Sequence, residues 1–166
     1  MKESNSRNVT DKSVALKTLQ RNLGYDFEDE GLLVNALVHS RHDKSKDLIT
    51  ATRLSWLGDA FLHQVVSDDL FHRHPKWTKH QLHTKRKNLT NNRMLGLLGE
   101  KLGVDEAADI DPSLLENLKD RDHHKMLAGM LEGVVGAIYL DGGLNEARRV
   151  ILQIWDGPLR VRTLDY

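Results

Sequence analysis

The chain has 166 residues, and its 24 lysines and arginines balance 24 aspartates and glutamates, so its formal net charge at pH 7 is zero. This length predicts one domain with a core of its own. A hydrophobic fraction of 39% and a mean hydropathy of −0.50 exclude disordered, collagenous and membrane-spanning classes. The absence of cysteine excludes disulfides and thiolate zinc sites. We expect an intracellular protein without a membrane partner, in a compartment that the sequence does not distinguish.

The beginning of the chain is polar. The first residues, MKESNSRNVTDKS, contain no apolar run, so the sequence predicts no secretory signal. We expect a flexible tail over residues 1–12 and a single domain over residues 13–166.

Along the rest of the chain, apolar side chains recur at intervals of three and four residues, which predicts an all-α fold. We see no strand pattern and no repeat. The third expected helix is long and should be central, residues 41–48 predict a loop, and Asp141-Gly142-Gly143 predicts a turn before the last helix. In chain order, the expected helices span residues 13–23, 28–38, 51–71, 82–89, 95–102, 126–140 and 147–154.

Charge is unevenly distributed along the chain. Between Leu70 and Gly99 there is no aspartate or glutamate, whereas acidic residues predominate between Glu100 and Asp122. Residues 71–98 are called the basic segment here. A clustered basic segment favours an anionic partner such as nucleic acid, but a solvated helix face explains it equally well. Its lysines and arginines are Arg73, Lys76, Lys79, Lys85, Arg86, Lys87 and Arg93.

Three separated segments resemble the ribonuclease III endonuclease domain. Residues 19–42, LQRNLGYDFEDEGLLVNALVHSRH, are similar to its opening helices, with an L-G-Y-x-F turn and an A-L-x-H-x-S ending. Residues 53–62, RLSWLGDAFL, resemble the signature helix E-R-L-E-F-L-G-D-A-V-L. Residues 125–143, KMLAGMLEGVVGAIYLDGG, resemble K-x-L-A-D-x-F-E-A-L-I-G-A-I-Y-L-D-x-G. With LHTKRKNLTNNRMLGLLGEKLG between them, similar to L-T-x-x-R-x-x-x-V-x-N, the resemblance extends from about Leu19 to Leu152.

The resemblance implies an all-helical, dimer-forming domain of a family that cleaves double-stranded RNA with metal-activated water held by four carboxylates. Carried over residue by residue, two of these positions keep a carboxylate, Asp59 in the signature helix and Glu132 in the late helix. The other two fall on Ser55 and Gly129. We therefore expect an impaired catalytic site and no cofactor. If activity persists, Asp59 and Glu132 would hold Mg²⁺ or Mn²⁺ weakly.

The same residues have plainer interpretations. Asp59 would pair with a nearby lysine or histidine, and Glu132 with Lys125 or Arg148, as most helix carboxylates are solvated or paired. The nine histidines have no cysteine partner and no H-E-x-x-H frame, so we expect no zinc site.

The resemblance also implies partners. Trp56 occupies the family's aromatic position that inserts into a second subunit, and Phe61 is expected at the same interface; the alternative for Trp56 is an ordinary core aromatic. The partner is an identical subunit or another ribonuclease III-like subunit. Double-stranded or structured RNA would contact the basic segment at Lys79, Lys85, Arg86, Lys87 and Arg93. Because the chain stops near Tyr166, we expect no double-stranded-RNA-binding domain after it.

The sequence thus favours a catalytically impaired ribonuclease III-like domain that dimerises and binds structured RNA within an RNA-processing or ribosomal assembly. The first alternative is an active Mg²⁺-dependent endonuclease with an altered metal site, completed by Ser55, water and RNA phosphate oxygens. The second is a protein-interaction module without a role in RNA, whose basic segment meets an acidic partner.

Overall fold

The computed structural model describes the backbone of residues 3–38, 49–110 and 118–160, and the side chains of residues 11–38, 49–110 and 118–156. Within these ranges the fold is all-α, as predicted, and the only strand-like feature is an isolated bridge between Val38 and Asp109. The predicted loop at 41–48 lies outside the described residues. The helices are α1 (Glu3–Leu23), α2 (Glu30–Ala36), α3 (Ala51–Arg73), α4 (Lys79–Leu89), α5 (Asn92–Leu102), α6 (Val104–Ala107) and α8 (Asp120–Arg160).

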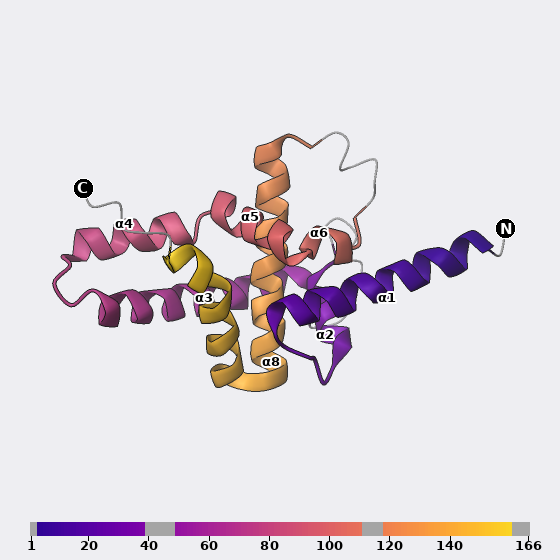
Figure 1. The fold of residues 1–166 in the computed structure, drawn as a ribbon, viewed down its shortest axis with the longest axis horizontal. Coiled ribbons are helices and arrows are strands. Elements are labelled where there is room, and N and C mark those ends of the chain that lie inside the picture. The colour runs from indigo at the N-terminus through magenta and orange to yellow at the C-terminus, as the bar shows by residue number, and fades with distance from the viewer. Residues whose placement is uncertain (1–2, 39–48, 111–117, 161–166) are drawn as a thin grey trace.

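Helix α8 forms the centre of the fold, and α2, α3 and α5 pack against it (Figure 1). Its most extensive contact is with α3, the helix that the sequence predicts to be central. The two backbones approach closely because glycines face each other across the crossing. A Cβ atom at Gly58 would collide with the carbonyl oxygen of Glu132, and one at Gly136 with that of Leu54. The crossing fixes which side chains of α3 and α8 can meet.

Helix α8 also contains a stretch with a mean hydropathy of 1.3, long and apolar enough to cross a membrane. In the fold, this stretch supplies side chains to the core, and Leu127, Leu131 and Ile138 are completely buried there. Packing inside the domain therefore explains its apolar character.

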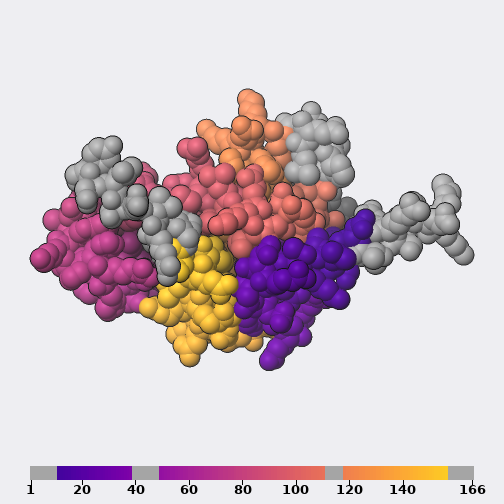
Figure 2. Space-filling view, in the orientation of Figure 1, coloured from indigo at the N-terminus to yellow at the C-terminus, as the bar shows by residue number. Residues whose placement is uncertain are grey.

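The predicted turn at residues 141–143 is a kink within α8. Gly143 has a φ of 79° and a ψ of −175°, which a residue with a side chain rarely adopts. After it, the helix folds back, and its last part lies between α1 and the hairpin of α3 and α4 (Figures 1 and 2). The indole of Trp155 is buried and donates to the carbonyl oxygen of Leu89, 3.3 Å away. This hydrogen bond connects the last part of α8 to the end of α4.

Asp141, one of the predicted turn residues, has a more specific role. Its carboxylate accepts hydrogen bonds from the Tyr25 hydroxyl (2.7 Å) and from the backbone N–H groups of Glu28 and Asp29 (2.9 Å each). Although burial acts in the opposite direction, these hydrogen bonds lower the pKa of Asp141. They fasten the turn between α1 and α2 to the kink in α8.

Several predicted helix bounds are wrong for identifiable reasons. Helix α1 begins at Glu3, ten residues before the predicted start. The prediction is too short because the first turns extend away from the body and carry no apolar stripe (Figure 1). The flexible tail remains a prediction. Helix α4 begins at Lys79 because Thr78 and Gln81 form a capping box. Helix α2 is shorter than predicted, since Asp29 caps it. The sequence does not predict α6, because its four residues are too few for a periodic pattern.

Candidate functional site

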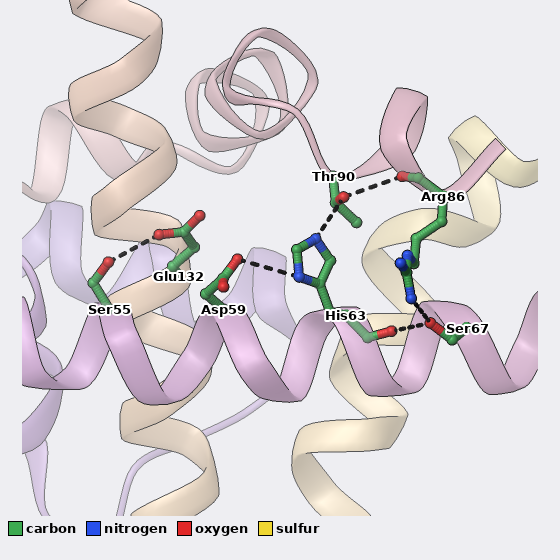
Figure 3. Close-up of polar contacts among 7 residues, drawn as sticks. All are labelled: Ser55, Asp59, His63, Ser67, Arg86, Thr90 and Glu132. Atoms are coloured by element: carbon green, nitrogen blue, oxygen red, sulfur yellow. Dashed lines mark hydrogen bonds and ion pairs between the residues drawn. The ribbon is translucent and has the colours of Figure 1, made fainter. Parts of the chain in front are cut away.

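One face of α3 carries a row of polar side chains at four-residue intervals: Ser55, Asp59, His63 and Ser67 (Figure 3). Four-residue spacing places neighbouring side chains on the same side of a helix. Glu132 meets this row from α8, and Thr90 and Arg86 meet it from the end of α4 (Figure 3). We call these seven residues the polar row.

At one end of the polar row, Ser55 and Glu132 form a pair. The Ser55 hydroxyl donates a 2.8 Å hydrogen bond to Oε2 of Glu132. Burial raises the pKa of the Glu132 carboxyl to about 7; the hydrogen bond from Ser55 opposes this rise and the negative charge of Asp59 adds to it. Glu132 is therefore a carboxyl group that holds a proton close to neutral pH.

In the middle of the row, Asp59, His63 and Thr90 follow one another. Oδ1 of Asp59 lies 3.6 Å from Nδ1 of His63, and the other ring nitrogen of His63 lies 2.9 Å from the hydroxyl of Thr90. The Thr90 hydroxyl also reaches the carbonyl oxygen of Arg86 at 3.1 Å. The imidazole thus connects a carboxylate on α3 with the end of α4.

At the far end, Arg86 anchors α4 to α3. Its guanidinium donates a 2.8 Å hydrogen bond to the Ser67 hydroxyl, which donates to the carbonyl oxygen of His63. Arg86 is half-buried by this contact. A predicted RNA-binding cation therefore has a structural role between two helices.

The structure brings together the four positions that the sequence analysis singled out. Ser55, Asp59 and Glu132 lie in the polar row, and a Cβ atom at Gly129 would lie 3.9 Å from the Ser55 hydroxyl oxygen. The plainer interpretation of Asp59 is confirmed, since His63 is its neighbour. That of Glu132 is wrong: its partner is Ser55, whereas Arg148 pairs with Asp68 at 2.7 Å. The crossing at Gly58 directs Glu132 toward Ser55.

The donor set of the polar row does not fit a divalent cation such as Mg²⁺. Among the residues that the structure describes, no three histidine, aspartate or glutamate side chains converge in a way that could hold a metal ion. The two carboxylates face Ser55 and His63, and Gly129 contributes no ligand atom. Mg²⁺ prefers oxygen ligands in near-octahedral arrangement, and two carboxylates with such neighbours do not supply it.

The lysines and the arginine of α4 that the sequence predicts to bind RNA lie on two sides of the helix. Lys79 and Lys87 are exposed, and His83 between them continues the same face at four-residue spacing. Lys85 and Arg86 are half-buried beside the apolar stripe of Leu82 and Leu89, and Arg93 is exposed in the first turn of α5. The predicted cations therefore do not form one continuous face.

The two predicted interface aromatics lie differently on α3. Trp56 is 78% exposed, so its alternative interpretation as a core aromatic is wrong. Phe61 is half-buried against Tyr139 of the same chain, with ring centroids 4.2 Å apart. Whether either residue contacts a second subunit stays a prediction.

The sequence did not identify three members of the site, His63, Ser67 and Thr90. The only signal for His63 was its spacing of four residues from Asp59. Thr90 is separated from His63 by 27 residues, and only the hairpin of α3 and α4 brings them together.

Comparison with known proteins decides the family. The Ribonuclease-III-like family model matches residues 29–156. The chain belongs to this family. Among curated relatives, Ribonuclease 3 of Shewanella sediminis is 32% identical over 147 residues, covering 86% of this chain and 61% of that protein. Ribonuclease 3 of Vibrio parahaemolyticus is 34% identical over 142 residues, covering 85% and 60%. The chain thus spans about three fifths of the relatives it matches.

Solved structures agree with this ribonuclease-III-like assignment. The nuclease domain of ribonuclease III from Campylobacter jejuni superposes with a TM-score of 0.76 at 28% identity, covering 86% of this chain and 96% of that one. That structure was described for flexibility in a region of the nuclease domain involved in dimer formation. Dicer from Pichia stipitis shares the fold alone, with a TM-score of 0.62 at 21% identity.

Proposed function

We propose that this ribonuclease-III-like chain binds structured RNA as a dimer and has lost most or all of its metal-dependent nuclease activity. One observation supports the proposed loss of activity: both carboxylates of the polar row already contact side chains of their own chain. Ser55 donates to Glu132, and His63 lies beside Asp59. A site that activates water on a metal needs several fixed carboxylates free to bind it.

Binding to RNA rests on exposed cations. Lys79 and Lys87 on α4 and Arg93 on α5 form no ion pair within the described parts of the chain, so their charge is available to phosphates. Recognition of an A-form helix through phosphates and 2′-hydroxyls makes binding largely independent of sequence. The setting we propose is an RNA-processing or ribosomal assembly.

Dimerisation rests on Trp56. A large apolar side chain that is 78% exposed on the surface of α3 is a strong candidate for an anchor in a partner's pocket. The partner is a second copy of this chain or another ribonuclease-III-like subunit. Pairing would place two polar rows on one assembly and lengthen the surface that RNA can occupy.

A second candidate function is an active endonuclease. The relatives named Ribonuclease 3, at 32–34% identity, favour it. In this case Ser55, water and RNA phosphate oxygens would have to complete a weak Mg²⁺ or Mn²⁺ site.

One experiment separates the candidates. The protein is incubated with long double-stranded RNA in Mg²⁺ and in Mn²⁺, and binding and cleavage are followed together. We expect salt-sensitive binding without cleavage above background. Efficient cleavage that Glu132→Gln abolishes would establish the endonuclease instead, and absence of binding at low salt would favour a module that meets an acidic protein.

A further inference from the structure

A pocket of about 580 Å³ lies beside the polar row, between the end of α2, the first turns of α3 and the first half of α8. Its volume falls within the range of small-molecule sites in proteins. Ser55 belongs to the polar row and also lines the pocket, so the pocket adjoins the row.

The pocket is open because residue 129 is a glycine. Gly129 lines it, and a Cβ atom there would make only an ordinary contact, 3.9 Å from the Ser55 hydroxyl oxygen. A longer side chain at this position would extend into the pocket without pushing the helices apart. Position 129 therefore offers a way to close the pocket while keeping the fold.

One part of the pocket is lined by apolar side chains. Met126 and Met130 line it from α8, and Ala36 and Val38 line it from the end of α2. Methionine thioethers make favourable contacts with flat aromatic rings. The walls suit a planar ring system.

The mouth of the pocket is polar and carries both signs of charge. Asp122 and Lys125, one turn apart on α8, are exposed, and neither forms an ion pair in the described portion of the structure. An ammonium group binds phosphate, and a carboxylate accepts hydrogen bonds from ring N–H and amino groups. A ligand that satisfies both combines an anionic group with a planar ring that carries adjacent donors.

We propose that this pocket receives a guanine nucleotide that has left the stacked helix of a bound RNA. The ring would pack between Met126 and Met130, its N–H and amino donors would face Asp122, and its phosphate would face Lys125. Bases stacked inside an A-form helix cannot enter such a pocket, so the nucleotide must be bulged or unpaired. The inference rests on the RNA binding proposed above. It adds that an RNA with a bulged or unpaired guanosine binds tightest.

The test compares two RNAs by fluorescence anisotropy, a perfect duplex and the same duplex with one bulged guanosine. We expect about three- to tenfold tighter binding of the bulged RNA, the gain that sulfur–ring contacts of the two methionines would provide. Gly129→Leu and Lys125→Ala should each bring the ratio of the two affinities close to one. Lys119→Ala is the matched control, because Lys119 is exposed just before α8 but does not line the pocket, and it should keep the preference.

A second arm uses guanosine 5′-monophosphate alone, measured by calorimetry, and separates this inference from the proposed function. If the protein binds no duplex but binds the nucleotide, and Gly129→Leu abolishes this, the pocket stands and the RNA-binding proposal fails. If both RNAs bind equally and the nucleotide does not bind, the pocket proposal is overturned while duplex binding stands. A bulge preference that survives both Gly129→Leu and Lys125→Ala would also overturn it, because the bulge would then be bound elsewhere.

Discussion

The Ser55 hydroxyl on α3 donates a 2.8 Å hydrogen bond to Oε2 of Glu132 on α8, at the point where the two longest described helices cross. A second carboxylate in place of this hydroxyl would repel Glu132 and would require a cation between the two groups. A hydroxyl attracts the carboxylate instead. The hydrogen bond between Ser55 and Glu132 therefore links α3 to α8 directly, without a bridging cation.

The pKa of Glu132 leads to a prediction about stability and pH. Its carboxyl titrates near 7 in the folded chain against an ordinary value of 4.5, so folding favours the protonated form. The stability that this contributes is fully present below about pH 4.5 and is lost as the pH rises through 7. Glu132→Gln keeps an acceptor for Ser55 but carries no charge. We expect it to match the parent protein in acid and to be more stable by about 1–3 kcal/mol at pH 8, in urea unfolding.

The control for this measurement is Glu146→Gln, which removes a carboxylate that pairs with Arg149 on the surface. Glu146→Gln should not raise the free energy of unfolding at pH 8. A difference between Glu132→Gln and the parent that is the same at every pH would contradict the raised pKa.

The crossing of α3 and α8 should tolerate no side chain at Gly58. In Gly58→Ala the new methyl group would collide with the carbonyl oxygen of Glu132, so the helices would have to separate. We expect a loss of about 3 kcal/mol in the free energy of unfolding. Gly129→Ala is the matched control on the same helix pair, since its methyl group has room; its stability should be unchanged or higher by up to about 1 kcal/mol. Equal effects of the two changes would show that helix propensity, rather than the crossing, governs these positions.

Trp56 should affect assembly without affecting folding. Because its side chain is 78% exposed, Trp56→Ala should leave the thermal unfolding of the monomer unchanged. If Trp56 anchors a dimer, the change should weaken association by about 2–4 kcal/mol in sedimentation equilibrium. Phe71→Ala is the control, as Phe71 is 64% exposed toward the other end of α3. A parent protein that stays monomeric at high concentration would exclude the homodimer and leave pairing with a different subunit.

The helices could be predicted from the sequence wherever an apolar stripe recurs, as in α3 and α5. A turn could be predicted at residues 141–143, but the contacts that hold it could not. The hydrogen bonds of Asp141 to Tyr25, Glu28 and Asp29 join segments more than a hundred residues apart.

The candidate site was predictable only in part, for the same reason. Motif resemblance located Ser55, Asp59, Gly129 and Glu132, since each keeps its place in a recognisable segment. It did not reveal that Ser55 is the partner of Glu132, which depends on the close approach at Gly58. The sequence shows where the lysines and arginines of the basic segment lie along the chain. It does not show that Lys87 is exposed whereas Arg86 is half-buried.

That distinction gives a prediction about RNA. Neutralising Lys79 and Lys87 to glutamine should lower affinity for duplex RNA and reduce the slope of log affinity against log salt by about two, one for each lost phosphate contact. Arg86→Gln should instead lower stability, because it breaks the hydrogen bond to Ser67. Lys101→Gln, exposed on α5 among acidic residues, is the control and should change neither quantity. A salt slope that is insensitive to Lys79 and Lys87 would place the RNA on another face.

The final prediction concerns the chemistry that this scaffold could regain. The double change Ser55→Glu with Gly129→Asp would place one carboxylate within the polar row and one beside it. Position 129 has room for a side chain. Without a cation, the carboxylate introduced at position 55 would repel Glu132, so we expect the double variant to be less stable than the parent in chelator and to regain stability in Mg²⁺. We also expect Mg²⁺-dependent cleavage of double-stranded RNA above the background of the parent. Ser55→Gln with Gly129→Asn has the same shape without the charge and should show neither response. Stabilisation by Mg²⁺ without cleavage would mean that His63, which stays beside Asp59, still prevents the geometry that hydrolysis requires, and adding His63→Ala to the double variant would then test that residue directly.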